Sequence, residues 1–200
     1  NGGQSCCAVE RIYVHESLFN EFVDGAMSFM NKLVIGDPMD KSTDMGPLAQ
    51  NSGIDTVIAQ LEDAEKKGAE ITFHSGVMPK GKKFIQPAIL TNVNHDMAIM
   101  MDETFGPIVG IIAVKSDDQA IKLMNDSPFG LTASVWTKDT EKAIEIGNQI
   151  ETGTFYQNRC DILDPAMPWV GVKNSGRGCT LSILGIQEMT RPKAFNLKID

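Results

Sequence analysis

The feature that most constrains the fold is an unbroken apolar run at residues 108–114, Ile-Val-Gly-Ile-Ile-Ala-Val. Such a run is typical of a strand that is buried on both faces of a sheet. Helix-like and strand-like segments alternate along the rest of the chain, which predicts an α/β fold with a mainly parallel sheet covered by helices. We expect strands at residues 12–14, 71–73, 84–85, 88–93, 108–114, 133–136 and 153–156. We expect helices at residues 19–33 (capped by Ser17), 54–64 (closed by Gly68), 116–125 and 140–149.

Composition limits the classes of function. The chain has 200 residues, a hydrophobic fraction of 42% and a formal net charge of −8. That length and apolar content suit one α/β domain, or at most two small ones, with a full core. No apolar run in the sequence reaches the length of a membrane span. The negative charge, without basic runs, argues against a nucleic-acid or anionic-membrane surface.

The four cysteines and three histidines are too scattered for a metal site. Cys6 and Cys7 are adjacent, while Cys160 and Cys179 lie far away with no metal-ligand spacing. We therefore expect no bound metal, and reduced thiols in a cytoplasmic protein.

The segment Gly3-Gln4-Ser5-Cys6 is a candidate site for nucleophilic chemistry. Gly2 and Gly3 allow the backbone to approach a ligand closely, and residues 4–11 are predicted to open a short helix. A cysteine in the first turn of a helix lies at the positive end of its dipole, which favours the thiolate, and its N–H is free to donate to an oxyanion. Taken alone, the segment more often indicates two cysteines packed as small hydrophobic residues.

Three further segments follow in a defined order: residues 102–107 (DETFGP), 125–131 (NDSPFGL) and 168–176 (PWVGVKNSG). With Gly-Gln-x-Cys at residues 3–6, the ordered set resembles the NAD(P)-dependent aldehyde dehydrogenase superfamily, from residue 1 to about residue 198. The resemblance implies the α/β catalytic domain of that fold, and it reverses the preference for two packed cysteines.

The resemblance assigns a role to three residues. It implies that Cys6, rather than Cys7, is the nucleophile that forms a thiohemiacetal and then a thioester with an aldehyde. It implies that Glu103 binds the nicotinamide ribose and that Phe105 packs beside the nicotinamide. Without the resemblance, Glu103 would be a solvated loop acid and Phe105 an ordinary core aromatic.

The resemblance also implies a substrate pocket and an assembly strand. Residues 158–163 correspond to a loop at the substrate entrance, so Asp161, Leu163 and Trp169 are candidate pocket residues. Trp169 stands where the family usually has Phe, and Thr180 stands where relatives carry a glutamate, which puts a proton-relay role there in doubt. Residues 191–199 correspond to a strand of the oligomerisation sheet, so a homo-oligomer is expected.

The resemblance implies oxidation of an aldehyde to a carboxylic acid with NAD or NADP. The family's nucleotide-binding domain, general-base glutamate and oxyanion amide precede the cysteine, and these 200 residues contain none of them. We therefore expect residues 1–200 to be the catalytic domain of a longer polypeptide that supplies the cofactor domain, and to be inactive alone.

Two other classes of function stay open from the sequence. One is a stand-alone thiol hydrolase or esterase, which would need a base near Cys6. The other is a non-catalytic structural or assembly domain of the same fold, in which Cys6 would be unreactive.

Overall fold

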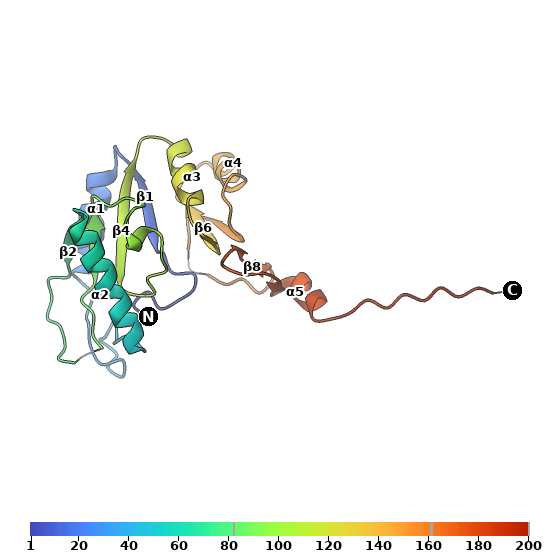
Figure 1. Cartoon of the computed structure of the whole chain (residues 1–200), viewed down its shortest axis with the longest axis horizontal. Coiled ribbons are helices and arrows are strands. Elements are labelled where there is room, and N and C mark those ends of the chain that lie inside the picture. The colour runs from blue at the N-terminus through green and yellow to red at the C-terminus, as the bar shows by residue number, and fades with distance from the viewer. Residues whose placement is uncertain (82, 161, 200) are drawn as a thin grey trace. The chain divides into compact units, whose positions relative to one another are not determined.

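The computed structural model describes residues 1–81, 83–160 and 162–199. The chain divides into two compact units, Asn1–Met124 and Asn125–Asp200, each built of strands and helices (Figure 1).

A four-stranded sheet forms the centre of the first unit. Its strand order is β1 (Arg11–His15), β4 (Ile108–Val114), β3 (Ala88–Thr91) and β2 (Glu70–Phe73). β4 is parallel to both β1 and β3, and only β2 is antiparallel to its neighbour. The predicted mainly parallel sheet is therefore confirmed in this unit, with the apolar run as one of its two inner strands.

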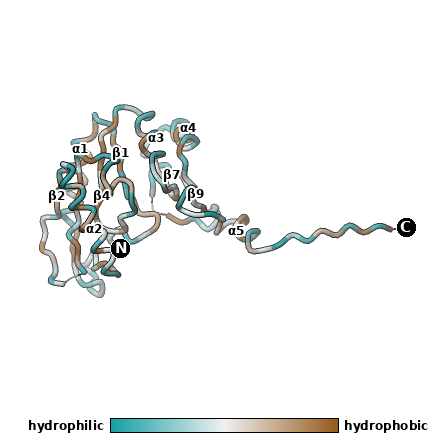
Figure 2. The backbone as a smooth tube through the Cα atoms, viewed as in Figure 1, coloured by the Kyte–Doolittle hydropathy of each residue, from teal (hydrophilic) through white to brown (hydrophobic). Residues whose placement is uncertain are grey.

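Each face of this sheet has its own helix and its own core. Because side chains alternate along a strand, neighbouring residues of β1, β3 and β4 enter different cores. The core on one face joins α2 (Asn51–Lys66) and the short 3₁₀ helix η1 (Ala98–Met100) to strand residues that include Tyr13, Ala88, Leu90, Ile108 and Ile112. The core on the other face joins α1 (Phe19–Met30) to strand residues that include Ile12, Val14, Ile89, Val109 and Ile111. Along α2, hydrophilic and hydrophobic residues alternate, as expected for a helix with one buried face (Figure 2).

Some helix ends differ from the sequence prediction. The Ser17 hydroxyl hydrogen-bonds to Nδ1 of His15 at 2.8 Å, so α1 begins after Leu18 without a side-chain cap. α1 ends at Met30, one turn before Leu33. The predicted end of α2 is correct, because Gly68 follows it with a φ of +89° that a glycine adopts without strain. The strand predicted at residues 84–85 is wrong, because neither residue joins a sheet.

The second unit contains a parallel strand–helix–strand motif. β6 (Thr132–Val135) and β7 (Thr154–Gln157) pair in parallel, and α4 (Thr140–Gly147) connects them. The Asp139 side chain caps α4 by accepting from the Lys142 N–H at 2.9 Å. α3 (Asp117–Asn125) ends where this unit begins.

Two short antiparallel pairs complete the second unit. β5 (Phe129–Gly130) pairs with β9 (Val172–Lys173), and β8 (Trp169–Val170) pairs with β10 (Cys179–Thr180) before α5 (Ser182–Glu188). Residues 191–199 pair with no strand of the described chain, and their apolar side chains are exposed.

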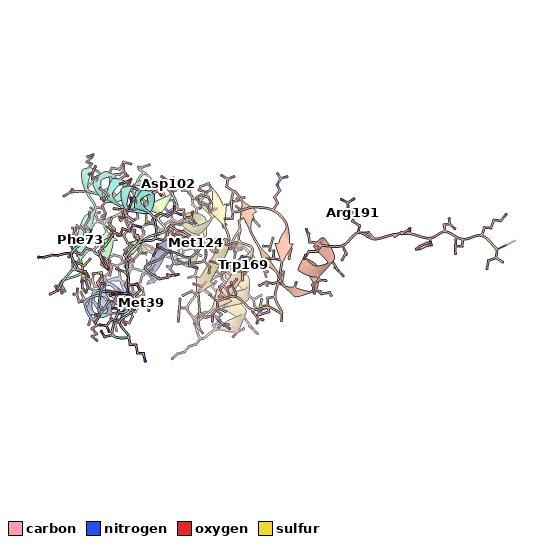
Figure 3. All side chains as sticks on the ribbon, turned by 90° about the horizontal axis from the view of Figure 1, so that it is seen from below. Met39, Phe73, Asp102, Met124, Trp169 and Arg191 are labelled. Carbon is pink, nitrogen blue, oxygen red and sulfur yellow. The ribbon has the colours of Figure 1, made fainter. Side chains whose placement is uncertain are left out.

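The core of the first unit gives a test of the fold. Leu90 of β3 is 0% exposed in the core that contains α2, whereas Met39, labelled in Figure 3, is 88% exposed. We expect Leu90→Ala to lower the free energy of unfolding by about 2–5 kcal/mol, because it leaves a cavity in a closed core. Met39→Ala is the matched control and should change it by less than about 0.5 kcal/mol. Urea unfolding of both variants measures this, and equal effects would contradict the assigned core.

Candidate active site

The cysteine segment is a series of turns and not a helix. Ser5 N donates to Gly3 O at 2.9 Å, and Ala8 N donates to Ser5 O at 3.0 Å. The bonded residues are two and three positions apart, whereas an α-helix bonds residues that are four positions apart. Gly2 and Gly3 have φ values of +65° and +77°, in the left-handed region. The helix predicted at residues 4–11 is therefore wrong, and so is the expected action of a helix dipole on Cys6.

The two adjacent cysteines have opposite environments. Cys6 is exposed, whereas Cys7 is only 6% exposed and its Sγ lies 3.3 Å from the Ser5 hydroxyl. Among the described residues, the Cys6 N–H has no hydrogen-bond partner, so it is free to donate to an oxyanion without any helix. Packing as a small hydrophobic residue therefore describes Cys7 and does not describe Cys6.

The glycine pair brings the cysteine segment against another part of the protein. A Cβ atom on Gly3 would lie 2.2 Å from the Gly106 carbonyl oxygen, so only glycine allows this approach. Gln4 holds the segment on both sides: its Nε2 donates to Asn1 O at 2.7 Å, and its Oε1 accepts from Ala49 N at 2.8 Å. The close approach predicted for a ligand is thus made to the backbone of residue 106.

Residue 106 belongs to the loop that carries the two candidate cofactor residues. Glu103 is exposed and Phe105 is 39% exposed, while Thr104 between them is buried. The Thr104 hydroxyl donates to Oε1 of Gln60 on α2 at 2.8 Å. Anchoring the middle residue leaves Glu103 and Phe105 accessible, so Phe105 is not a core aromatic. Asp102, which precedes this loop, is labelled in Figure 3.

Glu10 is a site residue that the sequence analysis missed. Its Oε2 accepts from Thr104 N at 2.9 Å and its Oε1 accepts from Phe105 N at 3.2 Å. Burial raises the pKa of this carboxyl above its ordinary value of 4.5; the bonds from Thr104 and Phe105 oppose the rise, and the nearby Glu103 charge adds to it. No local pattern marks Glu10, because its partners lie more than ninety residues away in sequence.

The second unit holds the candidate pocket residues. Leu163 is exposed, and Trp169, labelled in Figure 3, is half-buried on β8. The Tyr156 hydroxyl donates to the carbonyl of Ile162 and so fixes the chain next to Leu163. Asp161 lies outside the described residues.

Two segments of the sequence resemblance form one structure in this unit. The pairing of β5 with β9 joins residues 125–131 to residues 168–176. Lys173 Nζ donates to the carbonyls of Asn125 at 2.7 Å and Ser127 at 3.1 Å, and Gly130 N donates to the Ser175 hydroxyl at 2.9 Å. Lys173 and Ser175 thus connect the two segments by hydrogen bonds.

Other kinds of site were sought in the same residues. In residues 1–81, 83–160 and 162–199, no group of three or more His, Cys, Asp or Glu side chains could hold a metal ion. No helix in this described part of the chain is long and apolar enough to cross a membrane. In the described part of the chain, none of the four cysteines forms a disulfide bond.

Fold and site together define an α/β protein that presents an accessible thiol beside a loop with an exposed carboxylate and an exposed aromatic ring. The family model described as the aldehyde dehydrogenase family matches residues 1–195. The chain belongs to the aldehyde dehydrogenase family.

Individual relatives agree with this assignment. The chain is 42% identical over 194 residues to an aldehyde dehydrogenase of Paenarthrobacter nicotinovorans, covering 96% of this chain and 42% of that protein. It is 36% identical over 193 residues to succinate-semialdehyde dehydrogenase [NADP(+)] 1 of Mycobacterium tuberculosis, again covering 96% and 42%. The chain thus spans about two fifths of the length of the curated relatives it matches.

Solved structures share the fold. Betaine aldehyde dehydrogenase from Staphylococcus aureus in complex with NAD+ matches with a TM-score of 0.88 at 29% identity, covering 100% of this chain and 42% of that one. The structure of Gox0499, studied for cofactor and substrate selection, matches with a TM-score of 0.92 at 35% identity, covering 98% and 43%. The expected fold of the aldehyde dehydrogenase family is therefore confirmed.

The environments of the two cysteines predict their reactivity. Iodoacetamide should alkylate Cys6 in the folded chain much faster than Cys7, because only Cys6 is accessible to the reagent. Peptide mass spectrometry after timed quenching measures both sites, and the unfolded chain in urea is the control in which the difference should disappear. Faster labelling of Cys7 would contradict this assignment.

The raised pKa of Glu10 predicts a pH dependence of stability. Between 4.5 and the raised value, the folded chain binds a proton that the unfolded chain has released, so protonation favours the folded state. This contribution is fully present below 4.5 and is lost as the pH rises through the raised pKa. The free energy of unfolding of the unmutated chain, minus that of the Glu10→Gln variant, should therefore fall as the pH rises from 4.5 through the raised pKa. Urea unfolding at several pH values measures it, and a difference that rises with pH would contradict the raised pKa.

Proposed function

We propose that this chain supplies the nucleophile and the nicotinamide-side contacts for an NAD(P)-dependent oxidation of an aldehyde to a carboxylic acid. The observation that carries the proposal is the direct contact between the Cys6 segment and the Glu103–Phe105 loop, made by Gly3 against Gly106. A thiol that attacks a carbonyl must lie beside the group that accepts electrons from the same carbon.

The residues divide the chemistry as follows. The Cys6 thiolate adds to the aldehyde carbon, forming a C–S bond and an oxyanion that the Cys6 N–H is placed to bind. Glu103 and Phe105 would hold the nicotinamide end of NAD(P)+, which would supply the hydride acceptor for that carbon. The resulting thioester on Cys6 is cleaved by water, which releases the acid and regenerates the thiol.

The site suits a dinucleotide at its nicotinamide end. Glu103 is an exposed carboxylate that can accept bonds from ribose hydroxyls, and the partly exposed Phe105 ring can pack beside a flat heterocycle. The sequence resemblance places the contacts to the rest of the dinucleotide in the family's nucleotide-binding domain. We therefore expect the 200 residues alone not to reduce NAD(P)+ with an aldehyde, and the cofactor domain of the family to complete the site.

The candidate pocket residues rest on the sequence resemblance alone. We retain Asp161, Leu163 and Trp169 as residues that would contact the aldehyde. Arg159 is exposed, which suits a surface residue.

The segment at residues 191–199 is our candidate for oligomerisation. Hydrophilic and hydrophobic residues alternate along it (Figure 2), and Phe195, Leu197 and Ile199 are exposed. A strand of this pattern gains from pairing with a sheet of another copy. A nucleophilic thiol with no disulfide partner also suits a reducing compartment, so we propose a cytoplasmic homo-oligomer.

A stand-alone thiol hydrolase has less support. Among the described residues, no His, Asp or Glu side chain is hydrogen-bonded to Cys6, and the nearby Glu10 uses both carboxylate oxygens on backbone N–H groups. A base positioned for such chemistry is therefore missing from the described contacts.

The nucleophile assignment is tested in the complete enzyme, with the cofactor domain present. Cys6→Ala should abolish aldehyde oxidation while NAD(P) still binds, because only the bond-forming atom is removed. Cys7→Ala is the matched control and should retain most of the activity, since Cys7 packs as a small buried residue. Stopped-flow NAD(P)H formation and cofactor binding measure the two properties. Activity in the Cys6 variant, with Cys7 essential, would overturn the proposal.

A further inference from the structure

We propose that Glu10 is a positioning residue whose carboxylate fixes the main chain of the Glu103–Phe105 loop relative to the nucleophile Cys6. The inference rests on the proposed function, because it takes this loop to contact the cofactor.

The first support is how the carboxylate is used. Each of its oxygens accepts one backbone N–H, from Thr104 at 2.9 Å and from Phe105 at 3.2 Å. Hydrogen bonds to a charged acceptor are the stronger kind. A carboxylate with both oxygens bound in this way is poorly placed to move a proton, so it acts on the site through the loop.

The second support is that the backbone conformation of the loop needs stabilising contacts from other parts of the chain. Phe105 has a φ of +49°, a left-handed conformation that is unfavourable for an aromatic residue. Such a conformation persists only where the surroundings impose it. The bonds from Glu10 act on Thr104 and Phe105 themselves, and Gln60 holds the Thr104 hydroxyl from α2.

The third support is where Glu10 lies in the chain. Gly3 contacts Gly106, and Glu10 binds Thr104 and Phe105, so Cys6 lies in sequence between two attachments to one loop. A shift of the loop would therefore change the distance between the Cys6 thiol and the groups carried by Glu103 and Phe105. Glu10 thus couples the place of bond formation to the place of electron transfer.

The anchor is measured first without catalysis, in the 200-residue chain. Glu10→Gln keeps the side-chain length but turns one acceptor into a donor, so one of the two N–H groups loses its partner. We expect amide hydrogen exchange at Thr104 or Phe105 to quicken about tenfold or more. Glu16→Gln, an exposed acid just after β1, is the control and should leave both rates unchanged. Unchanged exchange in Glu10→Gln would overturn the proposal.

The consequence is then measured in the complete enzyme. We expect Glu10→Gln to slow the burst of NAD(P)H formation about tenfold to a hundredfold, because small errors of position are costly in rate. The cofactor-free burst of p-nitrophenol from p-nitrophenyl acetate reports acylation of the Cys6 thiolate and should be nearly unchanged. A parallel fall of both activities would indicate general damage to the fold and would overturn the positioning role.

Two further variants keep the outcomes distinct. Glu10→Asp keeps the charge with a shorter reach, so it should show smaller losses in the same assays, and it replaces Glu10→Gln if that variant does not fold. Glu103→Gln tests the function assigned to the loop. If it leaves the burst unchanged while Glu10→Gln still loses amide protection, the anchor stands and the proposed cofactor role of the loop fails.

Discussion

The site depends on one contact between two stretches of backbone. Gly3 lies so near the Gly106 carbonyl that any side chain at residue 3 would collide with it. Because Gly3 has no side chain, the cysteine segment can pack directly against the loop that carries Glu103 and Phe105. Gly106 is equally constrained on its other side, where a Cβ atom would lie 2.4 Å from a methyl group of Val57 on α2. The loop is therefore confined between the cysteine segment and a helix of the core.

The carboxylate of Glu10, near this contact, is placed where burial disfavours its charge. Glu10 is partly buried, and its carboxylate is bound by backbone N–H groups. Burying a charge in this way is unfavourable unless hydrogen bonds offset it, and the direction of its pKa shift indicates that they do so incompletely. A partly buried carboxylate with a shifted pKa that holds a loop in place is typical of functional regions.

Most of the regular structure could be predicted from the sequence, because it follows from local periodicity. The unbroken apolar run at residues 108–114 indicates a buried strand, and the helical spacing of apolar residues in α2 indicates a helix with one buried face. The errors arise where tertiary contacts decide. Residues 4–11 were expected to be helical, but the left-handed Gly2 and Gly3 and the pairing of β1 from Arg11 onward leave turns in between. Cys6, Glu103 and Phe105 are candidates because motifs mark them, whereas Glu10 and Gln60 bind partners far away in sequence and carry no local signal.

The parallel pairing of β1 with β4 has a consequence for how the chain folds as it is synthesised. Arg11 pairs with Gly110, so the strand that follows Cys6 has no neighbour until about a hundred more residues exist. At synthesis rates of roughly 5–20 residues per second, that wait lasts about 5–20 s. Until β4 exists, β1 lacks the strand with which it pairs in this sheet, and distant contacts of this kind form slowly. The strand that follows the nucleophile therefore gains its sheet neighbour only after β4 has been synthesised, although it precedes β4 by about a hundred residues.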